Sequence, residues 1–311
     1  MTVHTVAEMS TNKMKHRRLM ASPAELRVVL LGKTGAGKSS LGNTLLGRDA
    51  FLVECSFSSV TFRCQWAPTL RDGVNLQVTD TPGVSDTDRK EDEVLKEVGK
   101  SVAVASPGPH IVLFVLRCGR FTEEEYQAYV TLKRLFGEEI KKFMIIVFTE
   151  ADGLDGETEE EQMASLREAL SKAPTNMQEM LSDAEGRYFT VTNVAPFDQR
   201  ERQARQLLAV MQELVAQNGG AYFTNKLCAD VTTRVDDLVQ KRVQKEHVTP
   251  EIAATHTREA IVKEEEDSSF FKALGQIIKL AVVPVVGKFV GGAAKLVADA
   301  GLARISNCSV M

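Results

Sequence analysis

Short hydrophobic runs alternate with segments of helical periodicity over much of the chain. Near-continuous apolar runs predict strands buried on both faces, at 27–31, 110–116 and 143–148. Weaker alternation of apolar and polar positions predicts two more strands, at 58–66 and 76–80. Helical spacing predicts a helix that ends near Gly47 and two more at 88–105 and 122–136, the last with Thr122 as N-cap and Glu125 completing a capping box. This order predicts an α/β fold with a doubly wound, mostly parallel sheet and ligand loops at the carboxyl ends of its strands.

The turn after the first predicted strand carries the strongest chemical signal. Its sequence, GKTGAGKS at 32–39, fits the phosphate-cradling pattern G-x-x-x-x-G-K-[ST] of P-loop NTPases. Lys38 would reach the β- and γ-phosphates, and the Ser39 hydroxyl would bind Mg²⁺. An ordinary glycine-rich turn is the alternative, but the flanking strand and helix N-terminus favour an anion site. The predicted nucleotide contacts here are Gly32, Lys33, Thr34, Gly35, Ala36, Gly37, Lys38, Ser39 and Ser40.

The predicted strand at 76–80 leads into a second candidate site, DTPG at 80–83. Asp80 would hold a water molecule of Mg²⁺, and the N–H of Gly83 would bond a γ-phosphate, whose loss would release the loop that follows. A plain β-turn is the alternative. Thr61 is either a metal contact in a switch loop or simply a β-branched strand residue, and the sequence leaves both open. The predicted metal ligands are Ser39, Thr61 and Asp80.

A nucleotide base is expected at the end of the strand at 143–148, where the chain has TEAD at 149–152. GTPases commonly place Asn-Lys-x-Asp here. Asp152 would accept hydrogen bonds from guanine N1–H and the 2-amino group, and so select guanine over adenine. Thr149 replaces the asparagine, and Glu150 stands where a lysine stem would cover the ring. Asn193, after the apolar segment at 187–192, is a further candidate base contact.

Composition places the protein in a reducing compartment and argues against nucleic acid as a partner. The net charge of −4 offers no basic surface on which to base nucleic-acid binding. Five scattered cysteines suit neither a zinc site nor a secreted disulfide framework. The first residues lack the apolar core of a signal peptide, so we expect a cytoplasmic protein in which residues 1–24 form a flexible basic arm.

With these motifs in place, the chain resembles the GTPases of immunity-associated proteins, the GIMAP or IAN family, with its avrRpt2-induced-gene type of G domain. The resemblance covers residues 25–226. It is carried by 32–39, 59–61, 80–83, 149–152 and 218–220, and most specifically by LRCGRFTEE at 116–124. It implies guanine-nucleotide binding with Mg²⁺, weak hydrolysis, and self-assembly through the nucleotide-bearing face. The chain departs from the family in two places: Glu150 replaces a basic residue, and Val191-Thr192-Asn193 replaces an aromatic-Asn-Asn segment.

Beyond residue 226 the composition changes twice. Residues 227–267 are predicted to form a helical extension, with a helix at 226–245, a restart at Pro250 and a solvated boundary at 263–269. Residues 268–311 form an apolar tail in which Lys279 and Lys288 bracket a short charge-free run. These lysines disfavour a spanning helix and favour an interfacial or re-entrant membrane segment, with docking on the G domain or on a partner as the alternative. The chain ends in CSVM at 308–311, a C-a-a-X pattern that predicts a farnesyl group on Cys308, with an unmodified thiol as the alternative.

Together these features predict a GTP/GDP-controlled assembly switch on the cytoplasmic face of a membrane, with slow hydrolysis. The alternative is an active GTPase that is stimulated by self-association or by a partner. Val84 and Ser85 follow the DTPG turn in place of a water-positioning glutamine, so the sequence assigns no catalytic residue and favours slow hydrolysis.

Overall fold

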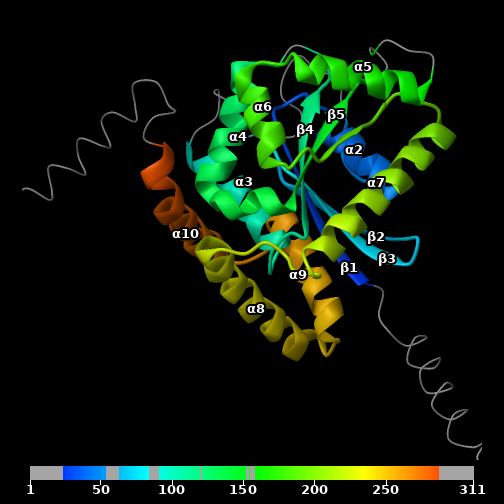
Figure 1. Ribbon diagram of the computed structural model, residues 1–311. Coiled ribbons are helices and arrows are strands. Elements are labelled where there is room, and N and C mark those ends of the chain that lie inside the picture. The colour runs from blue at the N-terminus through cyan, green and yellow to red at the C-terminus, as the bar shows by residue number, and fades with distance from the viewer. Residues whose placement is uncertain are drawn as a thin grey trace, which may run out of the picture.

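A single mixed sheet organises the part of the chain that the computed structural model describes, which is residues 24–53, 63–83, 91–119, 121–151, 154 and 158–286. Its strand order is β2-β3-β1-β4-β5-β6 (Figure 1). The strands are β1 (Ala24–Leu31), β2 (Gln65–Arg71), β3 (Val74–Asp80), β4 (Ile111–Arg117), β5 (Met144–Thr149) and β6 (Tyr188–Thr190). Every pair is parallel except β2–β3, which is antiparallel. The predicted doubly wound, mostly parallel sheet is confirmed.

Helices cover both faces of the sheet. On one face lie α2 (Lys38–Leu46) and α7 (Phe197–Gln217). On the other lie α3 (Glu91–Val104) and α4 (Glu123–Phe136), with the short helix η1 (Glu138–Phe143), α5 (Glu159–Ser171) and α6 (Thr175–Asp183) beside them. Successive residues of β4 enter the two cores in turn, Val112 and Phe114 on the α3 side and Leu113 and Val115 on the α2 side. The capping box predicted at the start of α4 is present.

The edge strand β2 differs from its prediction. The sequence predicts a strand at 58–66, whereas the strand begins at Gln65 and continues to Arg71. Residues 54–62, with Thr61, lie outside the described part of the chain. β2 contains Pro68 and lacks regular alternation of buried and exposed residues, which hides it from pattern analysis. A proline is tolerated here because β2 is at the edge of the sheet, where one side of the strand has no ladder to complete.

The helical extension consists of α8 (Lys226–Glu246), α9 (Pro250–Lys263) and α10 (Ser268–Val286). The predicted restart at Pro250 is confirmed: Pro250 is the first residue of α9, and the Thr249 side chain caps the helix. Figure 1 shows α10 running along the outside of the molecule beside α3 and α8. The division of the chain into a G domain and this extension stays a prediction.

The apolar face of α10 packs against α3 rather than facing a membrane. Phe270, Leu274 and Ile278 recur every four residues and are all buried. At Gly99 of α3 an added Cβ would lie 2.9 Å from Leu274 and 3.2 Å from Ile278, so the two helices approach closely at this glycine. For these residues the structure shows the docked alternative, while the interfacial membrane segment favoured by the sequence stays a prediction. Within the described residues, no helix has the length and apolarity needed to cross a membrane.

The acidic boundary before α10 is also more than a solvated linker. Glu264 forms ion pairs with Lys96 and with the fully buried Lys100 of α3, the latter at 3.3 Å. Glu266 pairs with Arg242 of α8 at 2.5 Å. These carboxylates join the end of α9 to the neighbouring helices, a role that their sequence pattern does not reveal.

We expect Leu274→Ala to lower the free energy of unfolding by about 2–4 kcal/mol, because it leaves a cavity between α10 and α3. Leu280→Ala is the matched control, since Leu280 lies on the same helix and is 81% exposed. Its effect should stay within about 0.5 kcal/mol. Urea denaturation of both variants checks this, and equal effects would mean that α10 does not dock on α3.

Candidate functional site

The turn from β1 to α2 can adopt its shape only with glycine. Gly32, Gly35 and Gly37 all have positive φ, at 144°, 81° and 85°. A Cβ at Gly32 would lie 2.3 Å from the Val115 carbonyl oxygen, and one at Gly37 would lie 2.7 Å from Asn193 Nδ2. At Gly35 no atom of the described chain comes within 4 Å of such a Cβ. The loop thus curls tightly against the sheet at its two ends and opens at its centre.

Helix α2 begins directly at this loop without a side-chain cap. Its N-cap is Gly37, which makes no side-chain hydrogen bond, and its first turn contains no acidic residue. The positive end of the helix dipole therefore faces the loop without a compensating carboxylate from its own first turn. Lys38, the first helical residue, is only 5% exposed and folds its ammonium back over the loop. It donates hydrogen bonds to the carbonyl oxygens of Gly32 and Lys33, at 3.1 and 2.9 Å.

A buried carboxylate lies beside this loop. Asp80 ends β3, is fully buried, and accepts a hydrogen bond from Ser39 Oγ at 2.6 Å. Burial raises the pKa of Asp80, while the charge of Lys38 and the hydrogen bond from Ser39 oppose the shift. The second oxygen, Oδ1, has no hydrogen-bond partner among the described residues. Leaving a buried carboxylate oxygen unpaired is costly, which is typical of a site that takes a ligand or an ion.

The donors at this position fit a hard cation. A hydroxyl and a carboxylate are oxygen ligands of the kind that Mg²⁺ prefers, and Mg²⁺ usually keeps several water or phosphate ligands besides. The described residues contain no group of three or more His, Cys, Asp or Glu side chains that could enclose a metal by themselves. A metal held by Ser39 and Asp80 would therefore rely on ligands from outside these two side chains. Thr61, the third predicted ligand, lies outside the described residues.

The DTPG turn lies directly against the phosphate-loop candidate. A Cβ at Gly83 would lie 2.1 Å from Thr34 Oγ1 and 2.5 Å from the Thr34 backbone nitrogen. Thr34 Oγ1 is itself buried and has no partner among the described residues. Thr81 fixes the turn from the other side, because its hydroxyl donates to the Leu30 carbonyl at 2.7 Å. Two motifs that are distant in sequence thus meet at the carboxyl edge of the sheet.

Two of the three candidate base contacts lie among the described residues, and both are bonded to the glycine loop. Thr149 is fully buried, and its hydroxyl lies 2.8 Å from the Ala36 carbonyl and 3.2 Å from that of Leu116, so it holds β5 against the loop. Asn193 donates to the Gly37 carbonyl at 3.3 Å, while its Oδ1 is buried and unpartnered within the described chain. Asp152 lies outside the described residues, and its contact with guanine stays a prediction.

Two ion pairs at this edge are not evident from the sequence. Lys33 of the loop pairs with Glu124 of α4, and Arg117 at the end of β4 pairs with Glu150 after β5. The partners are 91 and 33 residues apart, so no local pattern links them. Both cations stand at the carboxyl ends of parallel strands, where ligands bind in open α/β sheets.

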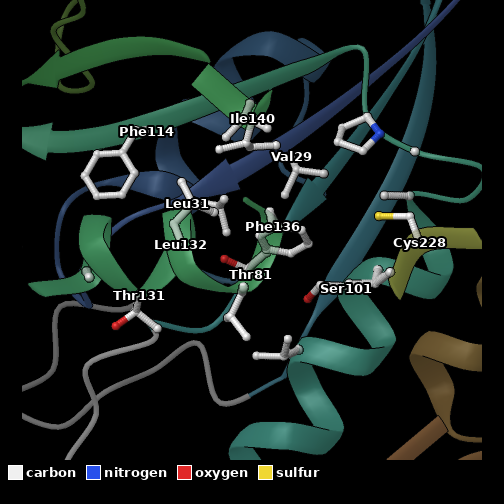
Figure 2. Close-up of a pocket in the computed structure, with 18 of the residues that line it drawn as sticks. Val29, Leu31, Thr81, Ser101, Phe114, Thr131, Leu132, Phe136, Ile140 and Cys228 are labelled. Atoms are coloured by element: carbon white, nitrogen blue, oxygen red, sulfur yellow. The ribbon is translucent and has the colours of Figure 1, made fainter. Parts of the chain in front are cut away.

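An apolar pocket lies behind the DTPG turn, between the sheet and helices α3 and α4 (Figure 2). Thr81 stands in its wall, with Val29 and Phe114 of the sheet and Leu132 of α4 nearby. Two hydroxyls of its wall are already engaged, since Thr81 Oγ1 donates to the Leu30 carbonyl and Ser101 Oγ to the Glu97 carbonyl at 2.9 Å. Burial raises the pKa of the Cys228 thiol in the same wall to about 11, so that thiol is neutral. This mostly apolar pocket does not suit a phosphate. The candidate functional site is therefore the glycine loop at the carboxyl edge of the sheet.

Comparison with known proteins agrees with this geometry. The model of the AIG1 family matches residues 26–243. The chain belongs to the AIG1 family. It is 31% identical over 258 residues to immune-associated nucleotide-binding protein 9 of Arabidopsis thaliana, covering 81% of this chain and 72% of that protein. It is 32% identical to member 12 of the same Arabidopsis group, covering 80% and 61%, and 30% identical to human GTPase IMAP family member 8, covering 65% and 29%. The resemblance to the GIMAP or IAN family is confirmed.

Solved structures similar to this AIG1-family chain include two GTPase domains. Toc33 of Arabidopsis thaliana, in complex with Mg²⁺ and GMPPNP, matches with a TM-score of 0.47 at 20% identity, covering 66% of this chain and 89% of that one. The G domain of the T. maritima FeoB iron transporter matches at 0.39 and 16%, covering 61% and 99%. The family assignment rests on the sequence matches, and the fold on the sheet described above.

We expect Asp80→Asn to raise the free energy of unfolding of the ligand-free protein at neutral pH. Because burial raises the folded-state pKa of Asp80, its contribution to stability is present below the unfolded pKa, about 4, and is lost as pH rises through the folded value. The neutral amide of the variant avoids this loss. The difference in free energy of unfolding between the variant and wild type should therefore grow as the pH rises above about 4. Urea denaturation across this range checks it. A variant less stable than wild type at neutral pH would show that the hydrogen bond from Ser39 outweighs the burial of charge.

Proposed function

We propose that this AIG1-family protein binds GTP and GDP together with Mg²⁺ and acts as a nucleotide-controlled assembly switch with slow intrinsic hydrolysis. The observation that carries the proposal is the glycine loop, with the buried Lys38 beside an unpaired oxygen of Asp80. The names of the AIG1-family relatives, nucleotide-binding proteins and a GTPase, support nucleotide binding but do not define the whole protein, since the chain spans only part of their length.

The residues divide the work of phosphate binding. The curled loop 32–37 and the uncapped start of α2 would hold the phosphates through backbone N–H groups. The ammonium of Lys38, which donates to two loop carbonyls here, would donate to phosphate oxygens instead when the nucleotide is bound. Ser39, Asp80 and Thr61 would hold Mg²⁺, which neutralises charge on the β- and γ-phosphates when bound. Among the remaining residues predicted from the motif, Ser40 belongs to the first turn of α2.

The base would be read at the ends of β5 and β6. Asp152 would supply guanine selectivity, Asn193 has an acceptor available in the described structure, and Thr149 would act mainly through the loop that it holds. These roles follow from general GTPase chemistry and from the positions of Thr149 and Asn193 beside Gly37.

The DTPG turn is the part of the site that would sense the γ-phosphate. Gly83 lies against Thr34, so a phosphate bonded to its N–H would fix the turn and its loss would release it. Helix α3 follows this turn in the chain and carries the docked α10. A movement of the turn would thus reach the helical extension through α3, which supports a switch rather than a site for turnover alone.

The second candidate is an active GTPase stimulated by self-association or by a partner, and the self-assembly that the family resemblance implies would allow the first of these. Single-turnover hydrolysis at rising protein concentration separates the two. We expect the rate per molecule to stay slow and to change less than about twofold from nanomolar to micromolar protein. A rate that climbs steeply with concentration would identify the stimulated enzyme, because the second copy would then supply what one chain lacks.

We expect Lys38→Ala to abolish detectable binding of GTP and GDP in calorimetry, because the loop loses the only side chain that the motif directs at the phosphates. Lys33→Ala is the matched control: it removes a lysine from the same loop, but one whose ammonium is paired with Glu124 outside it. That control keeps the backbone N–H of residue 33, the group through which this loop position is predicted to contact the phosphates, so it should bind within a few-fold of wild type. Circular dichroism verifies folding, and near-normal affinity in folded Lys38→Ala would reject the phosphate site.

We propose a cytoplasmic location, peripheral on an intracellular membrane face. Its support is the C-a-a-X end at Cys308 and the apolar residues of the tail beyond the docked face of α10. Both lie where the structure describes no side chains, and the farnesyl group stays a prediction.

A further inference from the structure

The pair formed by Arg117 and Glu150 stands beside the segment that is expected to read the base. Arg117 is the last residue of β4 and is in register with Thr149, the last residue of β5. The backbone N–H of Cys118 donates to the Thr149 carbonyl at 2.8 Å, so the two strand ends stay together. Arg117 Nε is paired with the Glu150 carboxylate across this junction.

The backbone at Glu150 is unusual in a way that serves this pair. Glu150 has a φ of 55°, in the left-handed region that non-glycine residues seldom enter. Its neighbours Thr149 and Ala151 are both buried, whereas the Glu150 side chain is 43% exposed. The reversed backbone therefore turns one carboxylate outward between two buried residues, toward Arg117. Strained backbone of this kind concentrates at binding sites.

The pair also lies close to the phosphate loop. Thr149, which adjoins both partners, is bonded to the Ala36 carbonyl, and its methyl carbon would be 3.2 Å from a Cβ at Gly37. Asn193 Nδ2 would be 2.7 Å from the same Cβ. A nucleotide whose phosphates occupy the loop would place its base at these strand ends, within the region that Arg117, Thr149 and Asn193 border.

We propose that Arg117 contacts the nucleotide and that its guanidinium, held by Glu150, covers one face of the purine ring. Guanidinium is planar, permanently charged and stacks on π-systems, which a carboxylate cannot do. Glu150 stands where a lysine stem would cover the ring, so the cation comes from the neighbouring strand and Glu150 orients it. This inference rests on the proposed function, because it assumes a guanine nucleotide in the site.

An ordinary surface ion pair would behave differently. Arg117 is 62% exposed, and exposed pairs contribute little to folding. Loss of a purely structural pair would change neither the melting temperature nor nucleotide affinity by much. Loss of a ring cover would leave the melting temperature of the ligand-free protein in place and lower affinity for every purine nucleotide.

The test measures affinities of the full chain for GTP, GDP and IDP with Mg²⁺ by calorimetry. We expect Arg117→Ala to weaken all three by a similar factor of about ten. Arg117→Lys should remain several-fold weaker than wild type, since an ammonium is not planar. The matched control is Arg205→Ala, which removes an arginine of 63% exposure that pairs with Glu201 at 3.2 Å on α7, and it should bind as wild type does.

Three outcomes would overturn the inference: affinity of Arg117→Ala within twofold of wild type, a loss confined to GTP, which would place Arg117 at the γ-phosphate, or full recovery in Arg117→Lys, which would make charge alone sufficient. A wild-type protein that binds no guanine nucleotide would instead reject the proposed function, and Lys38→Ala measured in parallel distinguishes that case.

Discussion

The structure of the site depends on the burial of one carboxylate. Asp80 lies at the end of β3 with one oxygen bonded to Ser39 and the other without a partner in the described chain. Such a group is tolerated only if a ligand compensates for it or if nearby charge does, and Lys38 supplies the charge. The first turn of α2, the end of β3 and the phosphate-loop candidate are therefore held in one electrostatic unit. The unpaired oxygen lowers the stability of the ligand-free protein, and it is also the atom that is available to a ligand.

Helix α3 links this unit to the rest of the molecule. Glu97 accepts a hydrogen bond from the Cys64 backbone next to β2 at 2.5 Å and pairs with the buried Lys100 at 3.0 Å. Lys100 reaches Glu264 at the end of α9, and Gly99 admits α10. Helix α3 thus contacts both the extension and the segment that leads into β2, the strand next to β3 and its candidate metal ligand Asp80. A movement of α3 would disturb these buried ion pairs and hydrogen bonds, which are costly to leave unpaired.

Most of the fold could be predicted because its signals are local. The buried strand at 110–116, the Thr122 capping box and Pro250 at the start of α9 depend on neighbouring residues, and each was found. Features that depend on distant partners could not be predicted. The face of α10 has the same pattern whether it meets lipid or α3, and the sequence does not reveal its close approach to Gly99. Likewise the glycine loop and DTPG turn were recognisable from sequence, whereas the Arg117–Glu150 pair required strand register.

The hydroxyl of Thr149 holds the loop without help from the side chains that follow it in the chain. It is bonded to the loop carbonyl of Ala36 and to the end of β4, and so belongs to the scaffold of the phosphate grip. The residues after it carry no such structural bond to the loop among the described contacts. A change of side chain at position 150 or 151 would therefore leave both of these contacts in place. The hydrogen bonds that fix the loop are thus separate in the chain from the positions predicted to read the base.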